Sequence, residues 1–129
     1  MKNRILTLIL ITATIAIVAC SSQKGQSVHD KLEGRWQLTE TLNDIGDGKG
    51  KYMPVTADSS YIVFSKSGLV SGNAIYGATN YKITDSTHLA LTIKGNTAPL
   101  NYRYQLNGNN LVLNAPCREA CGLRFKRMK

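Results

Sequence analysis

The sequence predicts an all-β protein, a small antiparallel up-and-down β-barrel of about eight strands that follows an N-terminal leader. Three observations lead to this prediction. The chain has 129 residues, which suits one domain. From Leu32 onward, apolar side chains recur at every second position, the period of a strand with one buried face. Turn-forming residues interrupt this pattern about every 8–12 residues, as in sandwiches and barrels.

The N-terminal residues have the pattern of a secretory signal peptide. Lys2 and Arg4 precede a mostly apolar stretch from Ile5 to Val18, which is shorter than the roughly 20 residues that span a bilayer. The stretch ends in Ile17-Val18-Ala19-Cys20, which resembles the bacterial lipobox. That resemblance implies cleavage before Cys20 and lipidation of its thiol. An ordinary signal peptide or an uncleaved anchor helix is the less favoured alternative.

We therefore divide the chain into a signal peptide (1–19), a lipidated flexible tether (20–30) and a barrel domain (31–129). The tether is rich in Ser, Gln and Gly, a composition typical of flexible linkers. Several acyl chains on Cys20 would hold the protein stably on a membrane, since each buried CH₂ contributes about 0.8 kcal/mol. Ser21 after the cysteine resembles the sorting pattern for the outer membrane of Gram-negative bacteria, with the domain facing the periplasm.

The alternating pattern predicts the strands in order. In the first strand, Trp36, Leu38 and Leu42 are expected on one face. The later strands are expected at 61–64, 70–76, 79–84, 89–93, 100–106, 111–113 and 123–125. The clearest alternation spans 100–106, where Tyr102 and Tyr104 take the inner face. Asn107-Gly108-Asn109-Asn110 follows and predicts a tight hairpin.

Several segments resemble known families. Leu32-Glu33-Gly34-Arg35-Trp36-Gln37-Leu38 is similar to the G-x-W opening strand of lipocalin-like proteins. The segments at 44–55, 61–68 and 116–121 resemble small lipocalin-like lipoproteins of Bacteroidetes, so the likeness spans about residues 31–127. It implies an up-and-down barrel with no cofactor and, for most bacterial members, no assigned ligand. A second resemblance, at 70–73 and 77–81, is to META-domain proteins; it ranks second because their Gly-Cys-Asn is missing here.

The two ends of the domain are predicted to meet. Trp36 is the single tryptophan, and in an up-and-down barrel the first and last strands are neighbours. Because side chains alternate along a strand, Arg127 is expected on the same face as Leu123 and Phe125. The lipocalin-like resemblance likewise implies that an arginine near the C-terminus packs over this tryptophan. Arg124 is the alternative, because a one-residue bulge would exchange the two faces.

With Cys20 assigned to the lipid, Cys117 and Cys121 remain as a pair. In an oxidising compartment such a pair is most simply a disulfide. A redox or zinc site is less favoured, because C-x3-C is not C-x-x-C. His29 and His88 also lack ligand spacing relative to these cysteines.

Four aromatic residues are candidate ligand-binding residues: Trp36, Tyr81, Tyr102 and Tyr104. They are expected inside the barrel, and an eight-stranded barrel either is filled by side chains or holds one small ligand. Plain core packing is the favoured interpretation of these side chains, and a small cavity that holds an apolar or amphipathic molecule is the alternative.

The sequence predicts no enzyme, cofactor or metal site. It contains no G-x-S-x-G motif, and no acidic residue is spaced to orient either histidine. Asp85-Ser86-Thr87-His88 indicates an ordinary turn. The segment 44–50 contains two carboxylates and a lysine, so a flexible Gly-rich hairpin loop is predicted there rather than a calcium site.

The charge balance narrows the partner class. Removing the leader leaves 14 basic and 8 acidic side chains, a net charge of +6. A solvated strand face with a frayed basic tail is the favoured explanation of this charge. If the charge binds a partner, an exported protein favours anionic lipid or cell-wall polymer over nucleic acid. The sequence thus predicts a lipid-anchored envelope protein that binds a small apolar or amphipathic ligand. The alternative is a non-enzymatic interaction protein that caps an envelope partner, and the oligomeric state stays open.

Overall fold

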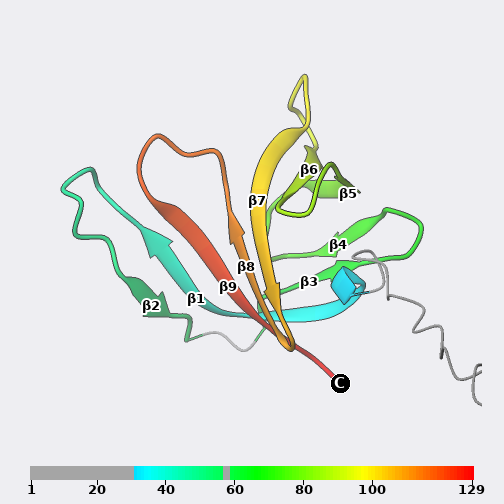
Figure 1. Cartoon of the computed structure of the whole chain (residues 1–129), viewed down its shortest axis with the longest axis horizontal. Coiled ribbons are helices and arrows are strands. Elements are labelled where there is room, and N and C mark those ends of the chain that lie inside the picture. The colour runs from blue at the N-terminus through cyan, green and yellow to red at the C-terminus, as the bar shows by residue number, and fades with distance from the viewer. Residues whose placement is uncertain (1–30, 57–58) are drawn as a thin grey trace, which may run out of the picture.

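A computed structural model describes residues 31–56 and 59–129. The signal peptide, Cys20, the tether and His29 lie outside these residues. One antiparallel sheet curls into a nearly closed barrel, which confirms the predicted fold class (Figure 1). Among the described residues, no helix is long and apolar enough to cross a membrane.

The barrel has eight strand positions. Its strands are β1 (Gly34–Asn43), β2 (Tyr52–Pro54), β3 (Tyr61–Phe64), β4 (Val70–Gly72), β5 (Ala78–Ile83), β6 (His88–Ile93), β7 (Leu100–Asn107), β8 (Asn110–Asn114) and β9 (Cys121–Arg127). The order of neighbours is β4-β3-β1-β9-β8-β7-β6-β5, and β2 pairs with the later half of β1. Because β2 and β3 lie end to end along β1, they share one position. β4 meets β5 through the bridge between Leu69 and Asn80.

The short strand β2 was not predicted. It follows the segment 44–50 that the sequence analysis assigned to a loop, and it has only three residues. Three residues are too few to establish a period of two, so only the pairing with β1 reveals the strand.

A bulge at Thr39 corrects the predicted inner face of the first strand. Leu38 pairs with Phe125 and Glu40 with Arg124, so Thr39 is an extra residue in β1. An extra residue reverses the alternation beyond it. Leu42 therefore faces outward instead of joining Trp36 and Leu38.

The alternation predicted for 100–106 is confirmed in β7. Tyr102 and Tyr104 are buried, whereas Arg103 between them is exposed. The predicted hairpin follows, with a two-residue loop between Asn107 and Asn110. Gly108 begins this loop with a φ of 57°, a conformation that glycine adopts without steric cost.

A single apolar core fills the space enclosed by the strands. Its buried members come from all of them except the short β2, and Leu32 adds to it from the helical residues that precede β1. Trp36, Leu32, Leu89, Leu91, Leu111 and Leu113 are each 0% exposed. Their side chains are therefore fully covered by packed protein atoms.

Arg127 and Trp36 join the last strand to the first. They are direct partners in the register of β9 with β1, and the guanidinium carbon of Arg127 lies 4.1 Å from the centroid of the Trp36 ring. Arg127 also donates hydrogen bonds to the carbonyl oxygens of Glu33, at 2.6 Å, and Lys31. The indole Nε1 of Trp36 donates to the carbonyl of Leu32 at 2.8 Å. The alternative, Arg124, faces outward and pairs with Glu40 at 2.8 Å.

Replacing Arg127 by Met should lower the free energy of unfolding by about 1–3 kcal/mol. The variant loses a cation–π contact and two hydrogen bonds from a charged donor. Urea unfolding of the domain beginning at residue 21, followed by circular dichroism, measures the change. Lys126→Met is the matched control, because Lys126 is an exposed neighbour on the same strand. Equal stability of the two variants would contradict a closing role for Arg127.

Candidate functional site

The four predicted ligand-binding residues all belong to the core. Trp36, Tyr81, Tyr102 and Tyr104 are at most 7% exposed. The ring of Tyr81 packs edge-on against Phe64, with centroids 4.9 Å apart. The hydroxyl of Tyr81 donates to the carbonyl of Ser65 at 2.9 Å, and that of Tyr104 donates to the carbonyl of Asp85 at 3.3 Å. Packing on all sides leaves little surface of these four side chains open to a ligand.

Burial also fixes the protonation state of the tyrosines. It raises the pKa of Tyr81, Tyr102 and Tyr104 above the ordinary value for a phenol. They therefore remain neutral hydrogen-bond donors at physiological pH. Tyr104 also borders a surface groove of about 370 Å³, together with Lys31, Thr87 and Leu106.

The loop between β1 and β2 is held in one conformation by Asp44. Its carboxylate accepts hydrogen bonds from the backbone N–H groups of Gly46 at 2.9 Å, Asp47 at 3.2 Å and Gly50 at 3.1 Å. These bonds lower the pKa of Asp44, and the bond from Gly50 has the largest effect. A Cβ atom at Gly50 would come within 2.7 Å of the Asp44 side chain, so the loop closes tightly around it. The sequence predicted a Gly-rich hairpin loop here but not the hydrogen bonds of Asp44 within it.

This ordered hairpin exposes two large apolar side chains. Ile45 is 83% exposed and Met53 is 62% exposed. Both line a groove of about 380 Å³ that Lys49 and Lys51 also border. Large apolar side chains gathered on a fixed loop are typical of interaction sites.

The disulfide loop supports the hairpin. Cys117 and Cys121 are bonded to each other, and closure of so short a loop contributes about 2 kcal/mol of stability in the chain-entropy model. Ala120 within the loop accepts a hydrogen bond from the backbone N–H of Asp44 at 2.9 Å. A Cβ atom at Gly46 would lie 2.9 Å from the carboxylate of Glu119. The loop therefore packs directly against the base of the hairpin.

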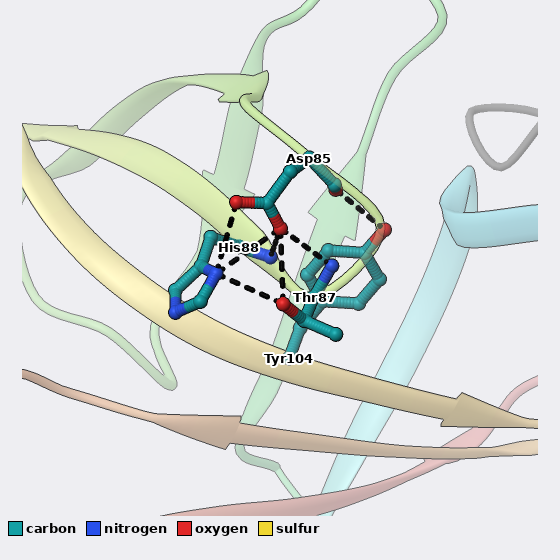
Figure 2. Close-up of polar contacts among 4 residues, drawn as sticks. All are labelled: Asp85, Thr87, His88 and Tyr104. Carbon is teal, nitrogen blue, oxygen red and sulfur yellow. Dashed lines mark hydrogen bonds and ion pairs between the residues drawn. The ribbon is translucent and has the colours of Figure 1, made fainter.

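The turn between β5 and β6 contains an aspartate that orients a histidine, which the sequence analysis did not expect. Figure 2 shows the carboxylate of Asp85 against the ring of His88, with the nearest oxygen 3.1 Å from Nδ1. The Thr87 hydroxyl lies 2.9 Å from the same nitrogen. The backbone N–H groups of Thr87 and His88 donate to this carboxylate at 2.7 and 2.8 Å. The turn brings these groups together because Asp85 caps it.

This arrangement orients a base without activating a nucleophile. In a hydrolytic triad, the acid and the hydroxyl bind opposite nitrogens of the imidazole. Here Asp85 and Thr87 both lie against Nδ1 of His88, so the second nitrogen faces away from the hydroxyl (Figure 2). Thr87 is therefore part of the turn and not a nucleophile.

Comparisons with known proteins leave the family open. No protein-family model matches the chain, and no curated protein matches it. Within the described part of the chain, no three His, Cys, Asp or Glu side chains gather as they would around a metal ion.

Asp85 should make stability depend on pH in acid. The hydrogen bond from the backbone of Thr87, with those from the His88 and Thr87 side chains, lowers the pKa of Asp85 from 3.8 to about 2. Because the folded-state pKa is the lower one, this contribution is complete above about pH 5 and disappears as the pH falls toward 2.

The urea midpoints of the parent protein and of Asp85→Asn should therefore differ at pH 6 and converge toward pH 2.5. The parent should lose more stability over this range. Asp44, whose pKa is also lowered, leaves the variant some pH dependence of its own. If the difference between the two urea midpoints stayed constant from pH 6 to 2.5, the contribution of Asp85 would be ruled out.

Proposed function

We propose that this protein is a non-enzymatic, lipid-anchored binding protein of the bacterial envelope that presents its β1–β2 hairpin to a protein partner. The leader and the lipobox pattern at Cys20 support the anchor. The sorting pattern after Cys20 supports an outer-membrane position facing the periplasm. The barrel fold is compatible with ligand binding, and the packing of its interior favours a partner on the outside.

The exposed pair Ile45 and Met53 carries this proposal. Ile45 lies on the loop that Asp44 holds in place, and Met53 lies on β2, which pairs with β1. Little conformational entropy would therefore be lost on binding. Lys49 and Lys51 border the same groove. A partner with an apolar pocket and an acidic rim would match this surface in shape and in charge.

The position of the hairpin suits an anchored protein. Arg127 holds Lys31, where the described domain begins, beside Trp36 at one end of β1. β1 then runs to the hairpin at its other end (Figure 1). A tether attached before Lys31 would leave the hairpin free to face a partner away from the attachment point.

A small apolar or amphipathic ligand is the second candidate. One observation favours it: Tyr104 lies in the core and also borders the groove beside Lys31. Native mass spectrometry of protein purified from its own host separates the candidates. We expect the mass of the lipidated chain alone, and a stoichiometric co-purified lipid would favour the second candidate.

Cys20→Ser should abolish membrane anchoring, because no other residue of the lipobox carries a thiol for the acyl chain. We expect an uncleaved or mislocalised protein that takes up no labelled palmitate. The measurement is fractionation of cells grown with that label. A cleaved, labelled variant in the membrane fraction would contradict the assignment of Cys20.

Ile45→Asp combined with Met53→Asp should abolish binding of the partner. A photo-crosslinking amino acid at Asp47, in intact host cells, should give a discrete crosslinked product that the double variant loses. Tyr76→Asp is the matched control, because Tyr76 is 96% exposed in the loop between β4 and β5. A product that persists in the double variant would exclude the hairpin as the contact.

A further inference from the structure

The outer face of the barrel carries a row of polar side chains away from the hairpin. His88 on β6 is the direct register partner of Arg103 on β7, and Arg103 is the partner of Asn114 on β8. Asn101 lies two residues before Arg103 on the same outward face. Partners in adjacent strands have Cβ atoms about 5 Å apart, so a small molecule can reach all of them.

These side chains line a groove of about 430 Å³, and its wall is partly apolar. The lining consists of His88, Asn101, Arg103, Asn114, Ala115 and Pro116. Ala115 and Pro116 lead into the disulfide loop, which fixes their position. The groove thus combines polar groups on its floor with an apolar edge.

His88 is held with one nitrogen available. Its Nδ1 lies 3.1 Å from both carboxylate oxygens of Asp85, and Asp85 is ionised at physiological pH. A neutral imidazole that donates from Nδ1 to this carboxylate has an acceptor lone pair on Nε2. Figure 2 shows Nε2 on the side of the ring away from Asp85, where it can accept a hydrogen bond from a hydroxyl group.

Arg103 and Asn114 supply the complementary groups. The described residues form two ion pairs, His88 with Asp85 and Arg124 with Glu40. Arg103 takes part in neither of them. Its planar guanidinium suits a carboxylate that accepts two parallel hydrogen bonds. Asn114 donates from Nδ2 to the carbonyl of Cys121 at 3.0 Å, which fixes the amide and leaves its oxygen as an acceptor.

We propose that this groove binds an acidic saccharide, with the sugar carboxylate on Arg103 and ring hydroxyls on His88 and the two asparagines. The apolar edge at Ala115 and Pro116 would contact the C–H face of the sugar ring. A simple anion would engage Arg103 alone, whereas a ligand that also carries hydroxyl groups would engage the acceptors on His88 and Asn114 as well. This site is separate from the hairpin and does not depend on the proposed protein partner.

Three small probes test the proposal with the full-length lipoprotein in detergent. Glucuronate carries both the carboxylate and the hydroxyls, glucose lacks the carboxylate, and cyclohexanecarboxylate keeps a six-membered ring and the carboxylate without hydroxyls. Saturation-transfer difference NMR gives each dissociation constant. Glucuronate should bind at least about tenfold more tightly than either other probe, because each lacks one set of hydrogen bonds.

Arg103→Gln should weaken glucuronate binding by at least about tenfold. Lys66→Gln, which removes the same charge from the exposed turn between β3 and β4, should leave binding unchanged. His88→Leu should reduce the preference for glucuronate over cyclohexanecarboxylate, since the two asparagines still bind hydroxyl groups. Circular dichroism of each variant checks the fold.

Four outcomes would overturn the proposal. They are the absence of saturable glucuronate binding, equal affinity for glucuronate and cyclohexanecarboxylate, equal affinity for glucuronate and glucose, and unchanged binding by a folded Arg103→Gln variant. The hairpin crosslink tests the proposed partner independently, so failure of one proposal is distinguishable from failure of the other.

Discussion

The pairing of β9 with β1 is the constraint on which the barrel depends. Among the strands described, β1 pairs with β2, β3 and β9, so it connects the two ends of the chain. Arg127 fixes this pairing at one end by lying over the Trp36 ring and bonding to the backbone before β1. Without this pairing, β1 and β9 would each expose an edge, and the core would open to water.

The bulge at Thr39 lets β1 contribute side chains to the core at one end and to outer contacts at the other. Before the bulge, β1 contributes Trp36 and Leu38 to the core. Beyond it the alternation reverses, and Glu40 pairs with Arg124 on the outside. Arg124 in turn lies 3.6 Å over the ring of Tyr52. These outer contacts add to the backbone pairing of β2 with β1 and so support the hairpin.

The disulfide loop connects the two proposed binding surfaces. Ala115 and Pro116, which come directly before it, line the groove that contains Arg103. The loop itself, through Ala120 and Glu119, supports the hairpin that exposes Ile45. A five-residue covalent loop is rigid, so it can hold both surfaces without a large core of its own. Both surfaces thus lie outside a barrel whose interior is occupied by packed aromatic and aliphatic side chains.

The sequence by itself determined which side chains of most strands face inward, because alternation is a property of the extended backbone and needs no partner strand. It also predicted the Cys117–Cys121 pair and the meeting of Trp36 with Arg127, which follow from residue counts and parity. The bulge at Thr39, the bonds of Asp44 and the pairing of Asp85 with His88 were decided by the tertiary structure. So was the row formed by His88, Arg103 and Asn114. Such contacts depend on strand register and turn geometry, which the alternation of side chains along the sequence does not specify.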